Sequence, residues 1–224
     1  GQLPPGSKLT DTGATAIDLG PAQIAPLPLP AEGWYEQPEP YNNVLVELEA
    51  FVDRQVLDDP EHLHLFLSAA GRPVFAWMLL PPGEPEPQLE QTTVRLRGVF
   101  TTVHTTDGRV GAIELKIQHP GAATLLHRLD DDPRFALPVS TLSSLRQRPR
   151  DALVHVIGTV RSQQPGSTLT LRDDTAQIEV LSGQSLPCRI GDLVEAVGYP
   201  EINGTEWQLR AALYRPYHPK AGEE

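Results

Sequence analysis

The tripeptide Asp11-Thr12-Gly13 is the stretch of this chain that most resembles a catalytic motif. Aspartic proteases carry their catalytic carboxylate in Asp-Thr-Gly, and two such carboxylates must share one proton. The chain holds no second Asp-Ser/Thr-Gly, and the ten residues before Asp11 are too few for the strands that should precede the motif. We therefore interpret Gly13 as a strand glycine and keep an aspartic protease at Asp11 only as an alternative.

Two histidines, His62 and His64, stand two positions apart in a predicted strand, so both side chains face one direction. A metal site would need a third ligand, and the spacing of His104, His119 and His127 does not supply one. We therefore expect His62 and His64 to be exposed or packed, and we predict no metal site.

Acidic residues form two short clusters. Asp130–Asp132 lacks the alternating ligand spacing and the distant Glu of a calcium loop, so we expect a solvated linker there. Asp173 and Asp174 end a strand, where Asp commonly accepts backbone N–H bonds in a turn. Because this edge borders the open face of the predicted barrel, both are candidate binding residues. Trp207 and Tyr214 are further candidates in the last strand, although packing against the barrel is the simpler role for them.

These residues belong to a chain whose apolar residues recur with the period of two that is typical of β-strands. The first set of predicted strands is VLVELEAFV (44–52), HLHLFLSA (62–69), RPVFAWMLL (72–80), TVRLRGVFTTVHT (93–105) and GAIELKIQH (111–119). The second set is ALVHVIGTVRSQ (152–163), STLTLRDD (167–174), QIEVLSG (177–183), DLVEAVGYPEI (192–202) and EWQLRAALYRPY (206–217). Between the sets, Ser140 or Thr141 is placed to cap a short helix that runs through Arg148.

The second set repeats the first, which indicates tandem domains. Short strands with a coil after the third and a glycine in the first and fourth favour five-stranded Greek-key barrels of the OB type. Gly98, Gly158 and Gly198 would let a strand bend and serve two sheets, and Gly191 turns the chain into a strand. Ala50 stands where the first domain would have its first-strand glycine. The predicted fold class is all-β.

The N-terminus carries a partial third copy of the repeat, because LPPGSKLTDTGATAIDLGPAQIAPL (3–27) parallels LPCRIGDLVEAVGYPEINGTEWQLRAAL (186–213). The predicted layout is a partial β module with a Pro-rich linker (1–40), a first OB-like domain (41–128), a linker with a short helix (129–150), a second OB-like domain (151–218) and a tail (219–224).

Composition argues against several classes of protein. With a formal net charge of −11 and no dense Lys/Arg cluster, the chain is not expected to bind nucleic acid or an anionic membrane. Phe66, Phe75 and Trp77 lie among acidic and aliphatic residues and are expected to pack in a core. The lone Cys188 excludes an intramolecular disulfide and a multi-cysteine zinc site. No catalytic triad or phosphate-binding loop has a readable spacing, so we predict no enzyme and no cofactor.

Three stretches resemble the N-terminal extracytoplasmic sensory region of bacterial sensor histidine kinases and hybrid two-component kinases. They are FALPVSTLSSL (135–145), VHVIGTVRSQQPGSTLTLRDDTAQIEVLS (154–182) and GDLVEAVGYP (191–200). The segment from VLVELEAFV to VRLRGVF (44–100) resembles the preceding module, so the resemblance covers residues 40–218. It implies tandem OB-like modules in the periplasmic part of an inner-membrane protein, membrane-anchored and dimeric through a kinase part whose H-box and ATP-binding glycine-rich box are not found in this sequence.

The function predicted from sequence is therefore a non-enzymatic sensory region of a two-component kinase. Its partner would be an unknown small molecule or periplasmic protein, with no nucleic acid, cofactor or metal. The alternative is an OB-fold module that binds single-stranded nucleic acid, and the second alternative is the aspartic protease at Asp11.

Overall fold

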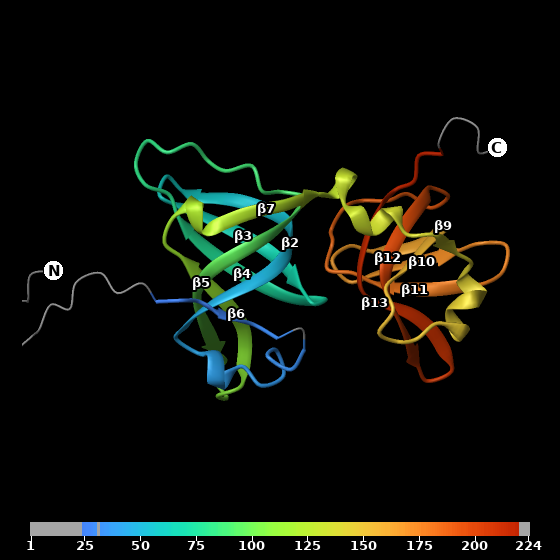
Figure 1. Cartoon of the computed structure of the whole chain (residues 1–224), viewed down its shortest axis with the longest axis horizontal. Helices are drawn as coiled ribbons and strands as arrows, with labels where there is room; N and C mark the ends of the chain where they lie inside the picture. Colours follow the sequence, from blue (N-terminus) through green and yellow to red (C-terminus); the bar gives the residue numbers. More distant parts are fainter. Residues whose placement is uncertain (1–23, 31, 220–224) are drawn as a thin grey trace, which may run out of the picture.

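The computed structural model describes residues 24–30 and 32–219. These residues form two β-barrels that lie side by side along the long axis of the molecule, joined by a segment of short 3-10 helices (Figure 1). The prediction of an all-β fold with tandem OB-fold-like barrels is confirmed. Most of the predicted N-terminal module, including Asp11 and Gly13, lies outside the described residues.

Four antiparallel strand pairings and one parallel pairing close the first barrel. Its strands are β2 (Val44–Asp59), β3 (His62–Ala69), β4 (Arg72–Leu79), β5 (Thr92–His104) and β6 (Val110–Ile117). They follow the order β2-β3-β4-β6-β5, and a further pairing of β2 with β5 closes the ring. Four short elements beside this barrel were not predicted. β1 (Leu27–Pro28) pairs with β2, and η1 (Glu39–Tyr41) precedes β2. η2 (Pro120–Ala122) follows β6, and β7 (Ala123–Arg128) pairs with β5.

The barrel closes because β2 is long enough to take part in two antiparallel pairings. Its residues 44–52 pair with β5, and its residues 51–59 pair with β3. Gly98 of β5 lies opposite Val46 where the sheet curves. A Cβ atom on Gly98 would lie 3.0 Å from the carbonyl oxygen of Lys116, so the close approach of β5 and β6 requires a glycine there.

Strand alternation fills the first core. In β3, the side chains of Leu63, Leu65 and Leu67 point inward and are buried, and the residues between them point outward. Trp34, from the segment before β2, covers one end of this core and contacts Phe100 edge-on, with 6.1 Å between the ring centroids. The inward side chains are therefore aliphatic over most of the barrel, and the large rings of Trp34 and Phe100 lie together near one end.

The linker folds as short 3-10 helices around a two-residue strand. These elements are η3 (Leu129–Asp131), η4 (Pro133–Ala136), β8 (Val139–Ser140) and η5 (Leu142–Gln147). The helix predicted through Arg148 is thus a 3-10 helix that ends at Gln147, and the side chain of Thr141 makes no cap hydrogen bond.

The prediction of a solvated acidic linker is wrong for Asp132. Its side chain is buried, accepts the backbone N–H of Arg134 at 3.0 Å, and forms an ion pair with the Arg134 guanidinium at 2.5 Å. Burial alone would raise the pKa of Asp132, but the hydrogen bonds and charge of Arg134 outweigh it and hold the pKa below its usual value. Asp132 therefore fixes the linker as an ionised cap of η4.

The second barrel repeats the topology of the first. Its strands are β9 (Val154–Gln164), β10 (Thr168–Arg172), β11 (Gln177–Leu181), β12 (Leu193–Asn203) and β13 (Glu206–Pro216). They follow the order β10-β11-β13-β12-β9, and β9 also pairs with β10. Gly158 lies against Leu171, and Gly198 lies at a register shift of β12 where a Cβ atom would come within 3.0 Å of the Arg210 carbonyl oxygen. Gly191 has a φ of +96° in the turn before β12.

The two barrels meet through an apolar cluster and a set of hydrogen bonds. The cluster consists of Phe51, Leu129, Phe135, Val197 and Leu213. Beside it, the Asp53 carboxylate accepts the backbone N–H of Ser185 at 2.7 Å and its hydroxyl at 2.5 Å. Asp53 sits at the register shift of β2, which leaves its side chain buried and directed at the second barrel.

Candidate functional site

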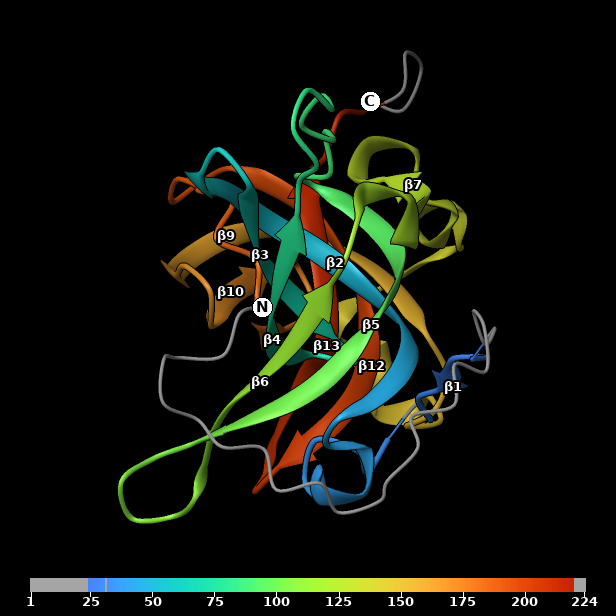
Figure 2. The same cartoon turned by 90° about the vertical axis from the view of Figure 1, so that its left-hand side faces the viewer.

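Aromatic rings gather on the outward side of β3 and β4, away from the core of the first barrel. Figure 2 shows β4 and β6 at the front of this barrel, with β12 and β13 of the second barrel behind them. The rings are half-buried, and a basic side chain lies at each edge of the group. We call this surface the aromatic face, and it consists of Arg54, His64, Phe66, Phe75, Trp77 and Lys116.

Strand register places these side chains in two rows across the barrel. In the first row, His64 of β3 lies opposite Trp77 of β4, which lies opposite Lys116 of β6. The rings of His64 and Trp77 stack with 4.2 Å between their centroids and 6° between their planes. The Lys116 ammonium lies 5.5 Å from the centroid of the Trp77 ring, within cation–π distance. It also pairs with Glu114 at 2.5 Å.

The second row runs parallel to the first. Arg54 of β2 lies opposite Phe66 of β3, which lies opposite Phe75 of β4. The Arg54 guanidinium is centred 4.1 Å from the Phe66 ring. The rings of Phe66 and Phe75 meet edge to face at 5.7 Å, and His64 joins the rows at 4.5 Å from Phe66. Each ring is thus fixed by a neighbour, so the face is held in one arrangement before a ligand binds.

His64 is the titratable group at the centre of this face. Burial among the rings lowers its pKa, with smaller opposing contributions from the carboxylates of Asp58 and Glu114. Its Nε2 atom is buried and has no hydrogen-bond partner. The neighbouring His62 instead contacts Asp59, with 2.8 Å between Nδ1 and the carboxylate. No group of three or more His, Cys, Asp or Glu side chains in the described part of the chain is placed to hold a metal ion.

The prediction that Phe66, Phe75 and Trp77 pack in a core is wrong. The inward positions of β3 and β4 are taken by the residues between them, such as Leu65 and Ala76, which are fully buried. The signal was present in the sequence, because a period of two that points leucines inward must point the intervening rings outward.

The acidic candidates Asp173 and Asp174 lie in the turn between β10 and β11. The Asp173 carboxylate accepts three backbone N–H groups, from Leu142 at 2.8 Å, Thr175 at 2.7 Å and Ala176 at 2.8 Å. Burial would raise the pKa of Asp173, but these bonds outweigh it and lower the pKa. The carboxylate is therefore engaged in joining the turn to η5, while Asp174 is exposed.

The aromatic candidates of the second barrel, Trp207 and Tyr214, lie on β13. Tyr214 is 1% exposed, and its hydroxyl donates to the Leu186 carbonyl at 2.7 Å and accepts from Gln163 at 2.8 Å. Burial raises its pKa well above the usual value. Trp207 is half-buried against the second core. Tyr214 is thus unavailable to a ligand in this arrangement.

The matching strands of the second barrel carry no aromatic side chain among the described residues. The outward residues of β10 and β11 are polar or aliphatic: Thr168, Thr170, Arg172, Gln177, Glu179 and Leu181. The two barrels therefore have the same strand topology but different outward side chains, and among the described residues the aromatic face is found on the first barrel.

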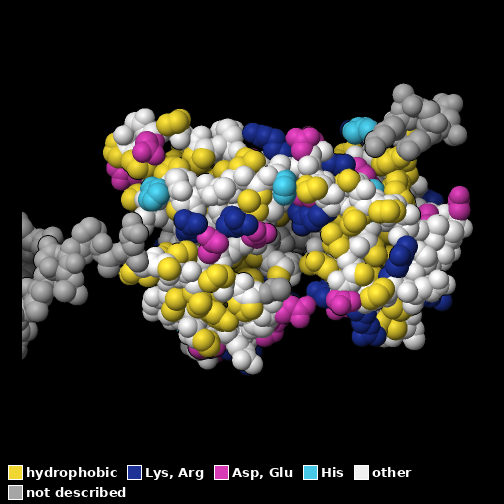
Figure 3. Space-filling model, viewed as in Figure 1, with side chains coloured by type: hydrophobic (Ala, Val, Ile, Leu, Met, Phe, Trp, Pro, Cys, Tyr) yellow, Lys and Arg dark blue, Asp and Glu magenta, His cyan; other side chains and the backbone are white. Residues whose placement is uncertain are grey.

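On the side of the molecule that Figure 3 shows, basic side chains lie beside acidic ones rather than gathered together. On the first barrel, Arg95 pairs with Glu49 at 2.6 Å and Arg97 with Glu47 at 2.7 Å. This agrees with the net charge of −11.

No family model and no curated protein matches the chain. Among solved structures, the tetrameric p202 HIN2 domain is similar with 15% identity and a TM-score of 0.32, over 79% of this chain and 95% of that chain. The p202 HIN1 domain in complex with a 12-mer double-stranded DNA has 12% identity and a TM-score of 0.31, over 78% and 94%. A replication protein A heterotrimer bound to single-stranded DNA has 11% identity and a TM-score of 0.34, over 81% and 51%.

These comparisons contradict the prediction of a sensory region of a two-component kinase with no nucleic-acid partner. The similar structures include proteins solved with double-stranded and single-stranded DNA. Identities and TM-scores this low give no correspondence between residues. No helix in the described ranges is long and apolar enough to cross a membrane. The predicted periplasmic location and absence of enzymatic activity stay predictions.

Proposed function

We propose that the first barrel binds single-stranded nucleic acid by stacking bases on the aromatic face. The observation that carries the proposal is the outward cluster of His64, Phe66, Phe75 and Trp77, with Arg54 and Lys116 at its edges. Aromatic side chains on which bases stack, next to cations that follow the backbone, are the means by which OB folds bind single strands.

The geometry favours a single strand over a duplex. Bases in a duplex are already stacked and paired, so their faces are not available to a protein ring, whereas unstacked bases offer theirs. The aromatic face presents rings and only two basic side chains, which is too little charge to hold a duplex by its phosphates.

The acidic surface sets how such binding depends on salt. The slope of log K against log salt is about −0.7 for each phosphate neutralised on a single strand. With Arg54 and Lys116 as the two cations at the edges of the face, a slope of about −1.4 is expected. Affinity should therefore come mainly from stacking and persist at physiological salt.

The proposal is tested by the affinity of wild type and of Trp77→Ala for a fluorescent single strand of about 12 nucleotides, within the 4–16 that one OB fold covers. Loss of one stacking ring costs about 1–3 kcal/mol, so we expect Trp77→Ala to bind about 5- to 150-fold more weakly. The Trp77 side chain points outward and does not pack in the core, so Trp77→Ala should fold.

Gln177→Ala is the matched control, because Gln177 is exposed on β11, the corresponding strand of the second barrel. It should bind like wild type. A duplex of the same sequence should compete poorly for the wild-type protein. Equal affinity of Trp77→Ala and wild type, or a preference for the duplex, would contradict the proposal.

A further inference from the structure

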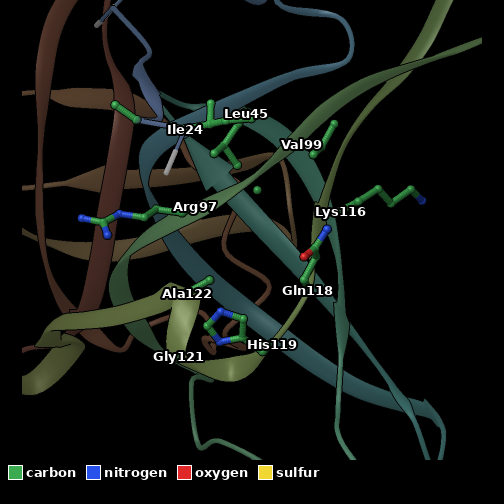
Figure 4. A pocket seen from close by; sticks show the side chains of 11 residues that line it. Ile24, Leu45, Arg97, Val99, Lys116, Gln118, His119, Gly121 and Ala122 are labelled. Carbon is green, nitrogen blue, oxygen red and sulfur yellow. The ribbon is translucent and has the colours of Figure 1, made fainter. Parts of the chain in front are cut away.

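A concave surface lies next to the aromatic face on the same barrel. The row that holds Trp77 and Lys116 continues around the barrel, because Lys116 pairs with Val99 of β5 and Val99 pairs with Leu45 of β2. Over these residues the structure has a groove of about 810 Å³ (Figure 4). Lys116 is common to the aromatic face and to the wall of this groove.

The groove combines an apolar floor with polar and basic groups at its rim. Leu45, Val99 and Ala122 contribute aliphatic side chains, and Gln118 and His119 stand at the end of β6. Figure 4 shows Leu45 pointing toward the middle of the group, while Arg97 and Lys116 extend to opposite sides. Such a surface suits a nucleotide. The aliphatic side chains of the groove would pack against the face of its base, and the two cations would contact the phosphates on either side.

Both cations remain within reach of solvent while paired. The Arg97 side chain is 61% exposed and donates from Nε to Glu47, and the Lys116 side chain is 48% exposed. A guanidinium has five N–H donors and an ammonium three, so each has donors beyond those used in its ion pair. The amide of Gln118 supplies both a donor and an acceptor for the edge of a base.

The distance between the two surfaces suits one continuous ligand. Adjacent strands lie about 4.8 Å apart, so Trp77 of β4 and Val99 of β5, with β6 between them, are separated by about 10 Å. A strand that stacks on Trp77 and passes its phosphate over Lys116 would enter the groove directly.

We propose that the groove binds the nucleotides adjacent to those stacked on the aromatic face, with a phosphate at Lys116 between the two sets and another at Arg97. This inference rests on the proposed function and extends it. The bound strand would cross β3, β4, β6 and β5, which makes the footprint longer than the aromatic face alone.

The test compares Val99→Glu with wild type for single strands of about 4 and about 12 nucleotides. The new carboxylate lies in the groove between Arg97 and Lys116, where it fills space and repels phosphate. We expect the long strand to bind about tenfold more weakly and the short strand to change less than about twofold. Gln177→Glu, with the same change of charge on the second barrel, should affect neither.

Equal weakening of both strands, or an unchanged affinity for the long one, would overturn the groove as a subsite. In that case wild type would still bind both strands in a Trp77-dependent manner. If instead wild type binds neither strand, the proposed function fails and the groove proposal fails with it. Should Val99→Glu fold poorly by circular dichroism, Gln118→Ala gives the same comparison, with selective weakening of the long strand expected.

Discussion

Phe100 and Trp77 are both large aromatic residues of the first barrel, and the side of the strand on which each stands decides its role. Phe100 points inward, is fully buried and packs against Trp34. Trp77 points outward and stacks with His64 at 4.2 Å. A ring in the core stabilises the fold, whereas a ring held at the surface by a neighbour can receive a base.

His64 gives the aromatic face a dependence on pH. Burial lowers its pKa below the usual 6.5, so near and below that pH the unfolded chain binds more protons than the folded one. The free energy of unfolding should therefore fall as the pH drops from 6.5 toward the folded pKa. Chemical unfolding at about pH 7 and about pH 5 measures this contribution.

The comparison variant is His64→Phe, which keeps a ring at the position and removes the titration. Its free energy of unfolding should fall less than that of wild type over the same interval of pH, and the difference is the share of His64. Identical pH dependence in the two proteins would mean that His64 is as solvated in the folded chain as in the unfolded one.

At the scale of the elements, the alternation of apolar and polar residues was enough to predict the ten barrel strands and their repetition. The same alternation also contains the aromatic face, since Leu65 and Ala76 are inward and the rings between the inward residues are not. Residue type alone does not indicate this face, because the side of the strand on which an aromatic residue stands decides whether its ring is buried. The groove beside it also requires the pairing of β2 with β5. These two strands are separated along the chain by β3 and β4, so their pairing leaves no local signal.

Gly98 is the residue by which β5 and β6 approach each other. A methyl group there would meet the Lys116 carbonyl oxygen at 3.0 Å and the side chains of Ile117 and Leu115 at 3.1 Å. We expect Gly98→Ala to lower the free energy of unfolding by about 1–3 kcal/mol, because a close-packed strand pair must move apart. Urea unfolding followed by circular dichroism measures it.

Arg95→Ala serves as the control for Gly98→Ala. Arg95 is outward on the same strand and its ion pair with Glu49 is exposed and screened by solvent, so its loss should leave the free energy of unfolding close to that of wild type. A stability of Gly98→Ala equal to that of wild type would show that the two strands are not held at this distance.

At the scale of the whole molecule, the contacts between the barrels are the part that the sequence did not indicate. Asp53 and Ser185 are separated by 132 positions and meet only when both barrels are formed. Arg215 of β13 likewise donates to the Leu129 carbonyl oxygen of the linker at 2.9 Å and lies over the Phe135 ring at 4.1 Å. Such pairs follow from the packing of finished domains, which neither composition nor strand period encodes.

Asp53→Ala tests whether this junction contributes to stability. The change leaves the Ser185 N–H without its acceptor in a part-buried place, so we expect a loss of about 1–3 kcal/mol in thermal or chemical unfolding. Asp174→Ala, at an exposed acidic position, should stay within about 0.5 kcal/mol of wild type. A loss no greater than that of Asp174→Ala would show that the bonds between the barrels add nothing.

We propose that the first barrel recognises the bases of a single strand rather than its phosphates. The most direct measurement is the affinity of the wild-type protein for a single strand of about 12 nucleotides and for an abasic strand of the same length and charge. We expect the strand with bases to bind at least about fivefold more tightly, because each stacked base contributes about 1 kcal/mol or more. Equal affinity for the two strands, or no binding of either, would contradict it.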